Sequence, residues 1–120
     1  MAYIINLKTF QDSRGDLSVL DSELPFAIQR VYYIYNTTNL KRGGHRHKIT
    51  KQILICLSGS CSVFVNNGRN QNTYLLNSPE QCLYLNPEDW HYMNNFQPNT
   101  ILLVLASEKF DINDYINEQY

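Results

Sequence analysis

The chain has 120 residues, of which 43% are hydrophobic and 18% are charged, as in ordinary folded domains. Ten Lys and Arg residues nearly balance eleven Asp and Glu residues, so no global basic field would favour nucleic acid or an anionic membrane. An anionic ligand must therefore meet local cations, and the length predicts a single domain spanning residues 1–120.

The N-terminal segment MAYIINLKTF lacks the long apolar region of a signal peptide, and no apolar run reaches membrane-spanning length. We therefore expect a soluble, cytoplasmic protein. The three cysteines, Cys56, Cys61 and Cys82, form an odd set without repeated spacing, which argues against a disulfide scaffold. Cys56 and Cys61 lie in apolar runs and are expected to act as small core residues.

Runs rich in Ile, Val, Leu, Thr and Tyr predict a chain that is mostly β-structure. In chain order, the predicted strands are residues 2–6, 16–20, 26–35, 51–58, 61–66, 72–77, 81–86, 89–95 and 100–106. Short strands separated by Gly, Asn, Ser and Pro are typical of a sandwich or barrel. Ser58-Gly59-Ser60 predicts a tight hairpin, and Asn66-Asn67-Gly68 predicts a second turn that tolerates positive φ.

In two of these predicted strands, the pattern of apolar residues also indicates which faces are buried. Within residues 61–66, Cys61, Val63 and Val65 alternate with less apolar neighbours and predict one strongly apolar face. The run TILLVLA (100–106) is apolar at nearly every position, so we expect both of its faces to be covered, one of them by a second subunit.

Only the tail, FDINDYINEQY (110–120), has a helical pattern. Asp111 or Asn113 is the expected N-cap of a short C-terminal helix, and Tyr115, Ile116 and Tyr120 are expected to share one face.

The stretch RGGHRHK (42–48) carries the most chemical information. On a strand, His45 and His47 point to the same side, whereas Arg46 points to the other. Gly43 and Gly44 allow a ligand to approach the backbone closely. Another histidine, His91, follows Trp90 in a second β segment, so the three imidazoles are candidates for one site.

A metal site and proton chemistry are the two uses that these histidines suggest. A metal site with His45, His47 and His91 as ligands remains an alternative. The carboxylate that usually completes such a metal site is replaced here by Gln52. Imidazoles also accept and return protons near neutral pH.

Arg14, in the turn DSRGD, and Arg42 are candidates to hold a phosphate or polarise a carbonyl oxygen. The alternative for Arg14 is a structural role as a turn residue held by Asp12 or Asp16. Tyr32 and Tyr33 alternate across their strand, so one of them faces inward.

The histidine spacing resembles the cupin pattern, and with it the fold class of a jelly-roll barrel. The first cupin motif has the form G-x5-H-x-H-x3-4-E-x6-G and is matched here by His45, His47, Gln52 and Gly59. The second motif, P-x-G-x2-H-x3-N, is matched with a contraction of one residue by Pro87, Asp89, His91 and Asn94 or Asn95.

The chain resembles more specifically the nucleotide-sugar 3,4-ketoisomerases, small cupins that act on dTDP-4-keto-6-deoxyglucose. The matching stretches span most of the length: DSRGDL (12–17), PFAIQRVYYIY (25–35), RGGHRHK (42–48), QILICLSGSCSV (52–63), LNSPEQCLYLNPEDWHYM (76–93) and VLASEKFDINDYI (104–116). One departure is Arg46, which stands where a small residue such as alanine is familiar.

The resemblance implies a strand-exchanged homodimer, catalysis by histidine and neither a metal nor a cofactor. His45 matches the family's principal base, His47 its second histidine, and Tyr32 a tyrosine lining the sugar pocket. Arg42 matches the arginine that opens the loop. Arg14 and His91 resemble the branch whose product has the galacto configuration at C4. Arg30 and Lys48 are further candidates to bind the diphosphate, and Tyr33 to bind substrate.

The expected activity is therefore the conversion of dTDP-4-keto-6-deoxyglucose into the 3-keto isomer, for deoxyamino-sugar biosynthesis and surface glycans such as O-antigen. Three alternatives remain open from the sequence: a metal-dependent cupin enzyme, a dTDP-sugar 3,5-epimerase and a non-catalytic sugar-binding cupin.

Overall fold

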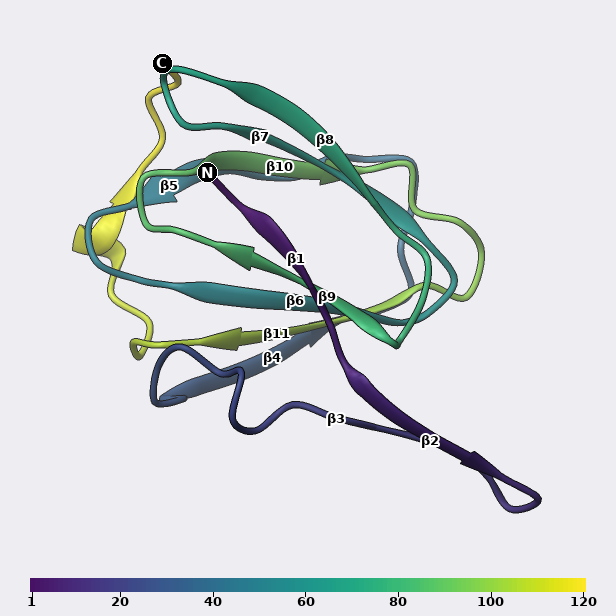
Figure 1. Cartoon of the computed structure of the whole chain (residues 1–120). Helices are drawn as coiled ribbons and strands as arrows, with labels where there is room; N and C mark the ends of the chain where they lie inside the picture. Colours follow the sequence, from purple (N-terminus) through teal and green to yellow (C-terminus); the bar gives the residue numbers. More distant parts are fainter.

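Two five-stranded antiparallel sheets and a separate hairpin make up the computed structural model, which describes all residues from 1 to 120 (Figure 1). The first sheet has the order β1 (Tyr3–Asn6), β9 (Gln81–Leu85), β6 (Gln52–Ser58), β11 (Ile101–Ala106) and β4 (Arg30–Ile34). The second has the order β12 (Tyr115–Ile116), β5 (Arg42–His47), β10 (Trp90–Asn94), β7 (Cys61–Asn66) and β8 (Gln71–Leu76). The hairpin joins β2 (Lys8–Asp12) to β3 (Gly15–Val19).

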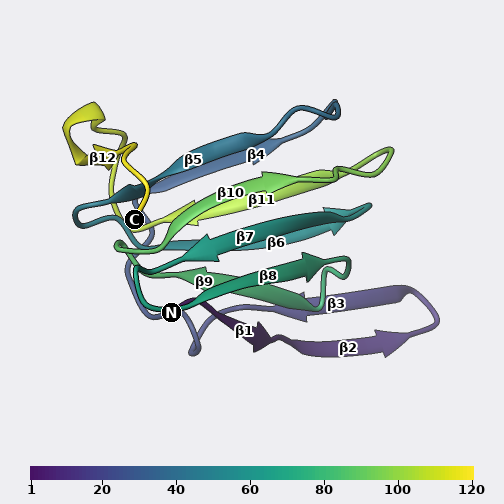
Figure 2. The same cartoon turned by 90° about the horizontal axis from the view of Figure 1, so that it is seen from above.

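The chain crosses between the two sheets after almost every strand from β4 to β12, and Figure 2, seen from above, shows one sheet lying over the other. The exception is β7–β8, which forms a hairpin through the predicted turn at Asn66–Gly68. This winding confirms the jelly-roll prediction. The edge strands β4 and β5 are not hydrogen-bonded to each other, so the fold is a sandwich rather than a closed barrel.

The predicted hairpin at Ser58–Ser60 is wrong, although the turn itself exists. β6 belongs to the first sheet and β7 to the second, so this turn carries the chain from one layer to the other. Gly59 has φ 73°, and a Cβ there would lie 2.8 Å from Cα of Thr100. Only glycine therefore lets the chain pass so close to Thr100, whose hydroxyl accepts a hydrogen bond from the Ser60 N–H at 3.2 Å.

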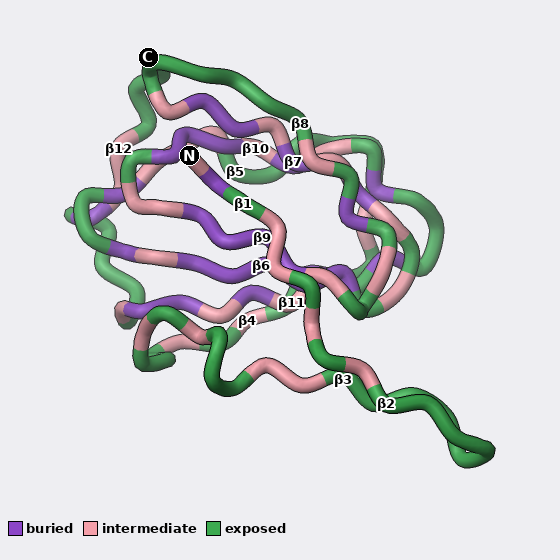
Figure 3. The backbone as a smooth tube through the Cα atoms, viewed as in Figure 1, coloured by how far each residue is buried: buried purple, intermediate pink, exposed green.

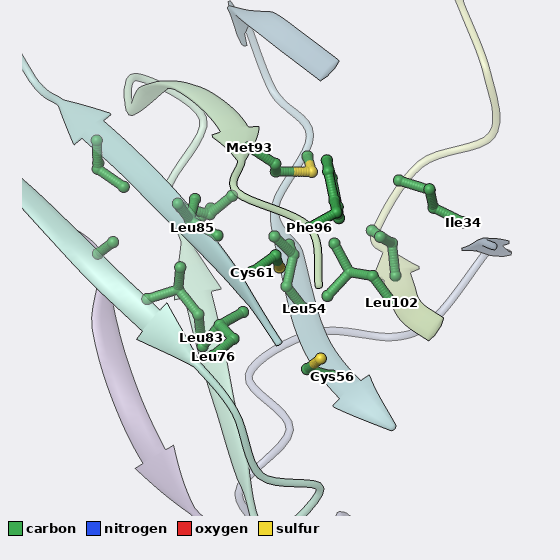
Figure 4. Packing of buried hydrophobic residues seen from close by; sticks show 14 residues of the cluster. Ile34, Leu54, Cys56, Cys61, Leu76, Leu83, Leu85, Met93, Phe96 and Leu102 are labelled. Carbon is green, nitrogen blue, oxygen red and sulfur yellow. The ribbon is translucent and has the colours of Figure 1, made fainter. Parts of the chain in front are cut away.

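Alternating side chains from both sheets fill the space between the layers (Figure 4). Cys61, Val63 and Val65 are fully buried there, which confirms the predicted apolar face of β7. Cys56 also lies in this core, as predicted. The burial follows from the period of two along each strand, which sends every second residue inward.

The strand β11 has one fully buried face and one partly buried face. Leu102 and Val104 point into the core between the sheets. Leu103 and Leu105 pack on a second cluster, to which Leu20, Leu24 and Phe26 of the same chain also contribute. The expected second cover is therefore supplied in part by the chain itself.

The predicted C-terminal helix is reduced to one 3-10 turn, Ile112–Asp114, followed by β12. Asp111 caps this turn, because its side chain accepts a hydrogen bond from the Asn113 N–H. The turn does not extend because Asp114 is buried against β5 and Tyr115 pairs with His47. Tertiary contacts thus override the local helical pattern. No helix in the structure is long and apolar enough to cross a bilayer.

The β2–β3 hairpin, here called the arm, projects away from both sheets (Figures 1 and 2). The sequence predicted β3 but not β2, and it placed the start of β4 four residues too early, at residue 26. The arm pairs with no other strand, and most of its residues are exposed (Figure 3). It contributes to a longest molecular dimension of 48 Å, compared with 32 and 26 Å for the other two.

Candidate active site

Three imidazoles meet on the inner face of the second sheet. His45 of β5 lies opposite His91 of β10 in the strand pairing, and His47 follows two residues later on the same face. The ring centroid of His45 is 5.2 Å from the centroid of His47 and 5.2 Å from that of His91. The predicted convergence of the three histidines is therefore present in the structure.

The histidines occupy a polar end of the space between the sheets. On three strands, a polar residue stands two positions before a core residue: Tyr32 before Ile34, Gln52 before Leu54 and His91 before Met93. Because residues i and i+2 share a face, these polar side chains continue the inner layer beyond the apolar core. The Gln52 amide donates to the Tyr32 hydroxyl at 3.2 Å, while the Gln52 carbonyl oxygen is buried without a partner.

His47 is held by a carboxylate that the sequence analysis did not identify. Its Nδ1 lies 2.8 Å from Oδ2 of Asp114, and both side chains are buried. Burial lowers the pKa of His47, and the hydrogen bond and charge of Asp114 oppose that shift. Although burial alone would raise the pKa of Asp114, hydrogen bonds from Thr50, Ile49 and His47 outweigh it and leave the pKa below its usual value.

His91 is held by a backbone carbonyl group just before its own strand, β10. Its Nδ1 lies 3.0 Å from the carbonyl oxygen of Asp89, which can only accept a hydrogen bond, so Nδ1 carries the proton. Nε2 of His91 is buried without a protein partner, as is Nε2 of His47. Two imidazole nitrogens with free lone pairs therefore lie beside His45. Complete burial lowers the pKa of His91 to about 3.

His45 has no carboxylate partner and lies between the other two histidines. Burial, and then the proximity of His47, lower its pKa to about 4, against an opposing hydrogen bond with the Gly43 backbone. It is therefore neutral at pH 7, which is the form that accepts a proton. Gly43 permits this arrangement, since it has φ 93° and a Cβ there would lie 3.0 Å from the His91 carbonyl oxygen.

Arg30, Tyr32 and Tyr115 form the wall beside the histidines. The Arg30 guanidinium donates to the Tyr115 hydroxyl at 3.3 Å and lies 4.5 Å from the centre of the Tyr32 ring. The Tyr115 ring is 4.8 Å from His45 and 4.6 Å from His47. Burial raises the pKa of Tyr32, and the charges of Arg30 and Arg42 act in the opposite direction.

Asp114 and Tyr115 were the functional candidates missed from the sequence. They come from the tail for which the sequence predicts a helix, and Asp114 is separated from His47 by 67 residues. The stretch VLASEKFDINDYI already matched the resembled family and contains both residues, so this match was the available signal.

The remaining candidates on β4 and β5 lie outside the histidine cluster. Arg46 points outward, as strand alternation predicts: its guanidinium donates to the Glu118 carbonyl oxygen at 3.4 Å and lies over the Tyr120 ring.

Tyr33 faces away from the histidines with 62% of its surface exposed, so Tyr32 is the inward tyrosine. Lys48 is exposed, and it is its backbone N–H that contacts Asp114. Arg42 is exposed at the start of β5 and lines a groove with Trp90 and Tyr92.

Arg14 lies at the tip of the arm, away from the histidines of its own chain. Its guanidinium forms an ion pair with Asp12 at 2.6 Å, and 88% of its side chain is exposed. The alternative interpretation of Arg14, a turn residue held by Asp12, describes the contacts within the chain.

At the usual carboxylate position stands Gln52, whose amide donates to the Tyr32 hydroxyl. No group of three or more His, Cys, Asp or Glu side chains has the spacing of a metal site. The arrangement instead provides neutral imidazoles with free nitrogens, one carboxylate and one guanidinium, which are the groups required to move protons next to an anionic oxygen.

The histidine cluster predicts a dependence of stability on pH. In the unfolded chain, His45 and His91 have pKa values of about 6.5, whereas in the folded protein they are about 4 and about 3. Between pH 6.5 and 4 the unfolded chain binds more protons than the folded protein. The free energy of unfolding therefore decreases as the pH is lowered, by up to about 1.4 kcal/mol per pH unit for each histidine. Urea unfolding at pH 7.5, 6, 5 and 4.5 measures this slope, and a flat profile would contradict the assigned burial.

Comparisons with known proteins agree with this geometry. The family model FdtA, described as "WxcM-like, C-terminal", matches residues 1–120. A TDP-4-oxo-6-deoxy-alpha-D-glucose-3,4-oxoisomerase from Aneurinibacillus thermoaerophilus is 42% identical over 118 residues, which cover 96% of this chain and 85% of that protein.

Solved structures give the same result. A 3,4-ketoisomerase from Helicobacter canadensis is 41% identical with a TM-score of 0.93, over 98% of this chain and 90% of that one. The WlaRB TDP-quinovose 3,4-ketoisomerase from Campylobacter jejuni is 43% identical with a TM-score of 0.93, over 98% and 92% of the two chains. The rmlC epimerase of Mycobacterium tuberculosis shares the fold, with a TM-score of 0.83 over 95% and 66% of the two chains, but only 19% identity.

Proposed function

The chain belongs to the FdtA family, and from this membership and the histidine cluster we propose that it is an isomerase that converts dTDP-4-keto-6-deoxyglucose into dTDP-3-keto-6-deoxygalactose. The observation that carries the proposal is the position of His45, a neutral imidazole that lies between two further imidazoles with free Nε2 atoms.

The reaction requires two proton transfers and no change in overall oxidation state. The hydrogen on C3 is acidic because the resulting anion delocalises into the C4 carbonyl. Its removal gives an enediol-type intermediate, and protonation at C4 then leaves the ketone at C3. General acid–base catalysis supplies about 10²–10⁴-fold of the rate, and groups that stabilise the enolate oxygen supply the rest.

We assign His45 as the base that takes the C3 proton and delivers it to C4. Tyr32 is assigned to the developing oxygen anion, since its hydroxyl lies on the same inner layer and accepts a hydrogen bond from Gln52. Arg30 and Arg42 are the cations assigned to the diphosphate, and Arg30 contacts Tyr115, whose ring packs on His45 and His47. Lys48 is exposed and is assigned a smaller contribution to diphosphate binding than the two arginines.

A strand-exchanged homodimer would complete the site. The arm exposes Phe10 and Leu17, which are paired across it, with 53% and 58% of their surfaces accessible. Val31 and Tyr33 on β4, and Tyr35 just after it, are also exposed. Large apolar surfaces of this kind favour association. We propose that the arm lies on a second copy and that Arg14 enters the partner's site, where Arg14 and His91 would select the face on which C4 is protonated.

The 3-keto product is a substrate suited to an aminotransferase, so we place the reaction in the biosynthesis of a deoxyamino sugar for a surface glycan. The sugar nucleotide would be made and used in the cytoplasm.

Incubating the purified protein with dTDP-4-keto-6-deoxyglucose and following the sugar by ¹H NMR tests this function. We expect the ketone to move to C3 and the coupling constants of H4 to report the galacto configuration. A sugar epimerised at C3 or C5 that keeps its C4 ketone would instead identify a 3,5-epimerase. Recovery of unchanged substrate would contradict the enzymatic assignment.

A further inference from the structure

Asp114 lies between the histidine cluster and the C-terminal turn, and each of its two carboxylate oxygens has two hydrogen-bond partners. Oδ1 accepts hydrogen bonds from the backbone N–H groups of Lys48 at 3.1 Å and Ile49 at 2.8 Å. Oδ2 accepts the hydroxyl of Thr50 and lies 2.8 Å from Nδ1 of His47. A buried carboxylate with four donors is held firmly in one orientation.

This orientation determines the tautomer of His47. An ionised carboxylate can only accept hydrogen bonds, so Nδ1 of His47 must carry the hydrogen. Nε2 is then a lone-pair acceptor, and it is buried without any protein partner. The His47 ring is also packed between His45 and Tyr115, at 5.2 and 4.6 Å. The structure therefore prepares His47 to take up a proton from another group at Nε2.

The proposed reaction contains a second proton for which such an acceptor is needed. When His45 removes the C3 proton, the electron pair forms the C3–C4 double bond, and the C4 oxygen becomes an anion. The proton on O3 must then pass to O4, which leaves the anion on O3. That anion forms the C3 carbonyl as the double bond takes a proton at C4 from His45. One proton thus moves between carbons and another between oxygens.

We propose that Asp114 is a positioning residue that holds His47 in the Nδ1–H form, so that Nε2 carries the proton from O3 to O4. In this scheme, which rests on the proposed function, His45 and His47 have separate tasks. His45 moves the carbon-bound proton and His47 moves the oxygen-bound proton.

The variant Asp114→Asn tests the role of the carboxylate, because the amide can fit in only one way. Its oxygen must remain with the two backbone N–H groups of Lys48 and Ile49, so its NH₂ group faces Nδ1 of His47. That NH₂ group donates to Nδ1, and the hydrogen of His47 moves to Nε2. In serine protease triads, the corresponding substitution lowers kcat by about 10⁴-fold through the wrong tautomer.

The tautomer can be read directly from long-range ¹H–¹⁵N spectra of ¹⁵N-histidine-labelled protein at pH 7.5, since the chain has only three histidines. We expect Nδ1–H for His47 in the wild type and Nε2–H in Asp114→Asn. We also expect kcat to fall by about 10²–10⁴-fold, with KM changed by less than about threefold. The control Asp111→Asn makes the same substitution at the exposed cap of the same turn and should change neither quantity.

An Nε2–H tautomer of His47 in the wild type would overturn the proposal, and this measurement does not depend on whether Asp114→Asn folds. An Asp114→Asn protein that is folded, has the switched tautomer and retains its kcat would also overturn it. A wild-type protein with the Nδ1–H tautomer but no turnover would refute the proposed function and leave the positioning of His47 by Asp114 supported.

Discussion

The variant His45→Asn should fold normally and lose turnover by about 10³-fold or more. His45 lies between the other two histidines and has no carboxylate partner, and its pKa of about 4 keeps it neutral at pH 7. Asparagine has a similar volume but no basic nitrogen, so the C3 proton has no acceptor in the variant. Rates of product formation by NMR, with thermal unfolding as the measure of folding, test this expectation.

The matched control for this variant is Arg46→Asn, one residue further along β5. Arg46 lies on the opposite face, and its guanidinium contacts the C-terminal segment at Glu118 and Tyr120. It should retain turnover close to that of the wild type. A His45→Asn protein with a rate within about tenfold of the wild type would show that another group is the base.

The second large effect is expected from the double substitution Phe10→Ser/Leu17→Ser on the arm. Each side chain is about half exposed in the single chain, and a strand-exchanged dimer would bury four of them. At about 1.5–3 kcal/mol for a fully buried side chain, the double variant should weaken association by about 3 kcal/mol or more, which is over 100-fold in the dissociation constant. Sedimentation equilibrium measures this constant, and turnover should fall as the dimer dissociates because Arg14 would no longer reach the partner's site.

The control Thr9→Ala/Ser18→Ala changes the neighbouring cross-strand pair of the arm, whose hydroxyl groups are 2.7 Å apart. It removes little apolar surface and should leave the dimer intact. A wild-type protein that is monomeric at micromolar concentration, or a monomeric double variant with full turnover, would contradict the strand-exchanged site.

The sequence predicted the strands well where alternation is strong, as in β7, where Cys61, Val63 and Val65 are fully buried. It failed at Ser58–Ser60, since a tight turn between two apolar runs is compatible with either a hairpin or a crossing between layers. That choice depends on Thr100, which lies 40 residues away and packs on Gly59. β2 was missed because Lys8–Asp12 carries only one strongly apolar residue, Phe10.

Within the site, local spacing was sufficient to place His45 and His47 together and to turn Arg46 outward. His91 required a second motif, and the pairing of β5 with β10 confirms its position opposite His45. Asp114 could not be predicted from local pattern, because its contact with His47 depends on the path of the tail. The wrong expectation of a C-terminal helix came from the same segment, where burial of Asp114 outweighs helical propensity.

The central claim, proton transfer from C3 to C4 of a dTDP-linked 4-keto sugar, is tested most directly by running the reaction in D₂O and locating the deuterium by NMR. Our account predicts a 3-keto product that carries deuterium at C4, wholly or in part, because the proton that His45 takes from C3 exchanges with D₂O before C4 is protonated. Deuterium at C3 or C5 in a sugar that keeps its C4 ketone would contradict it.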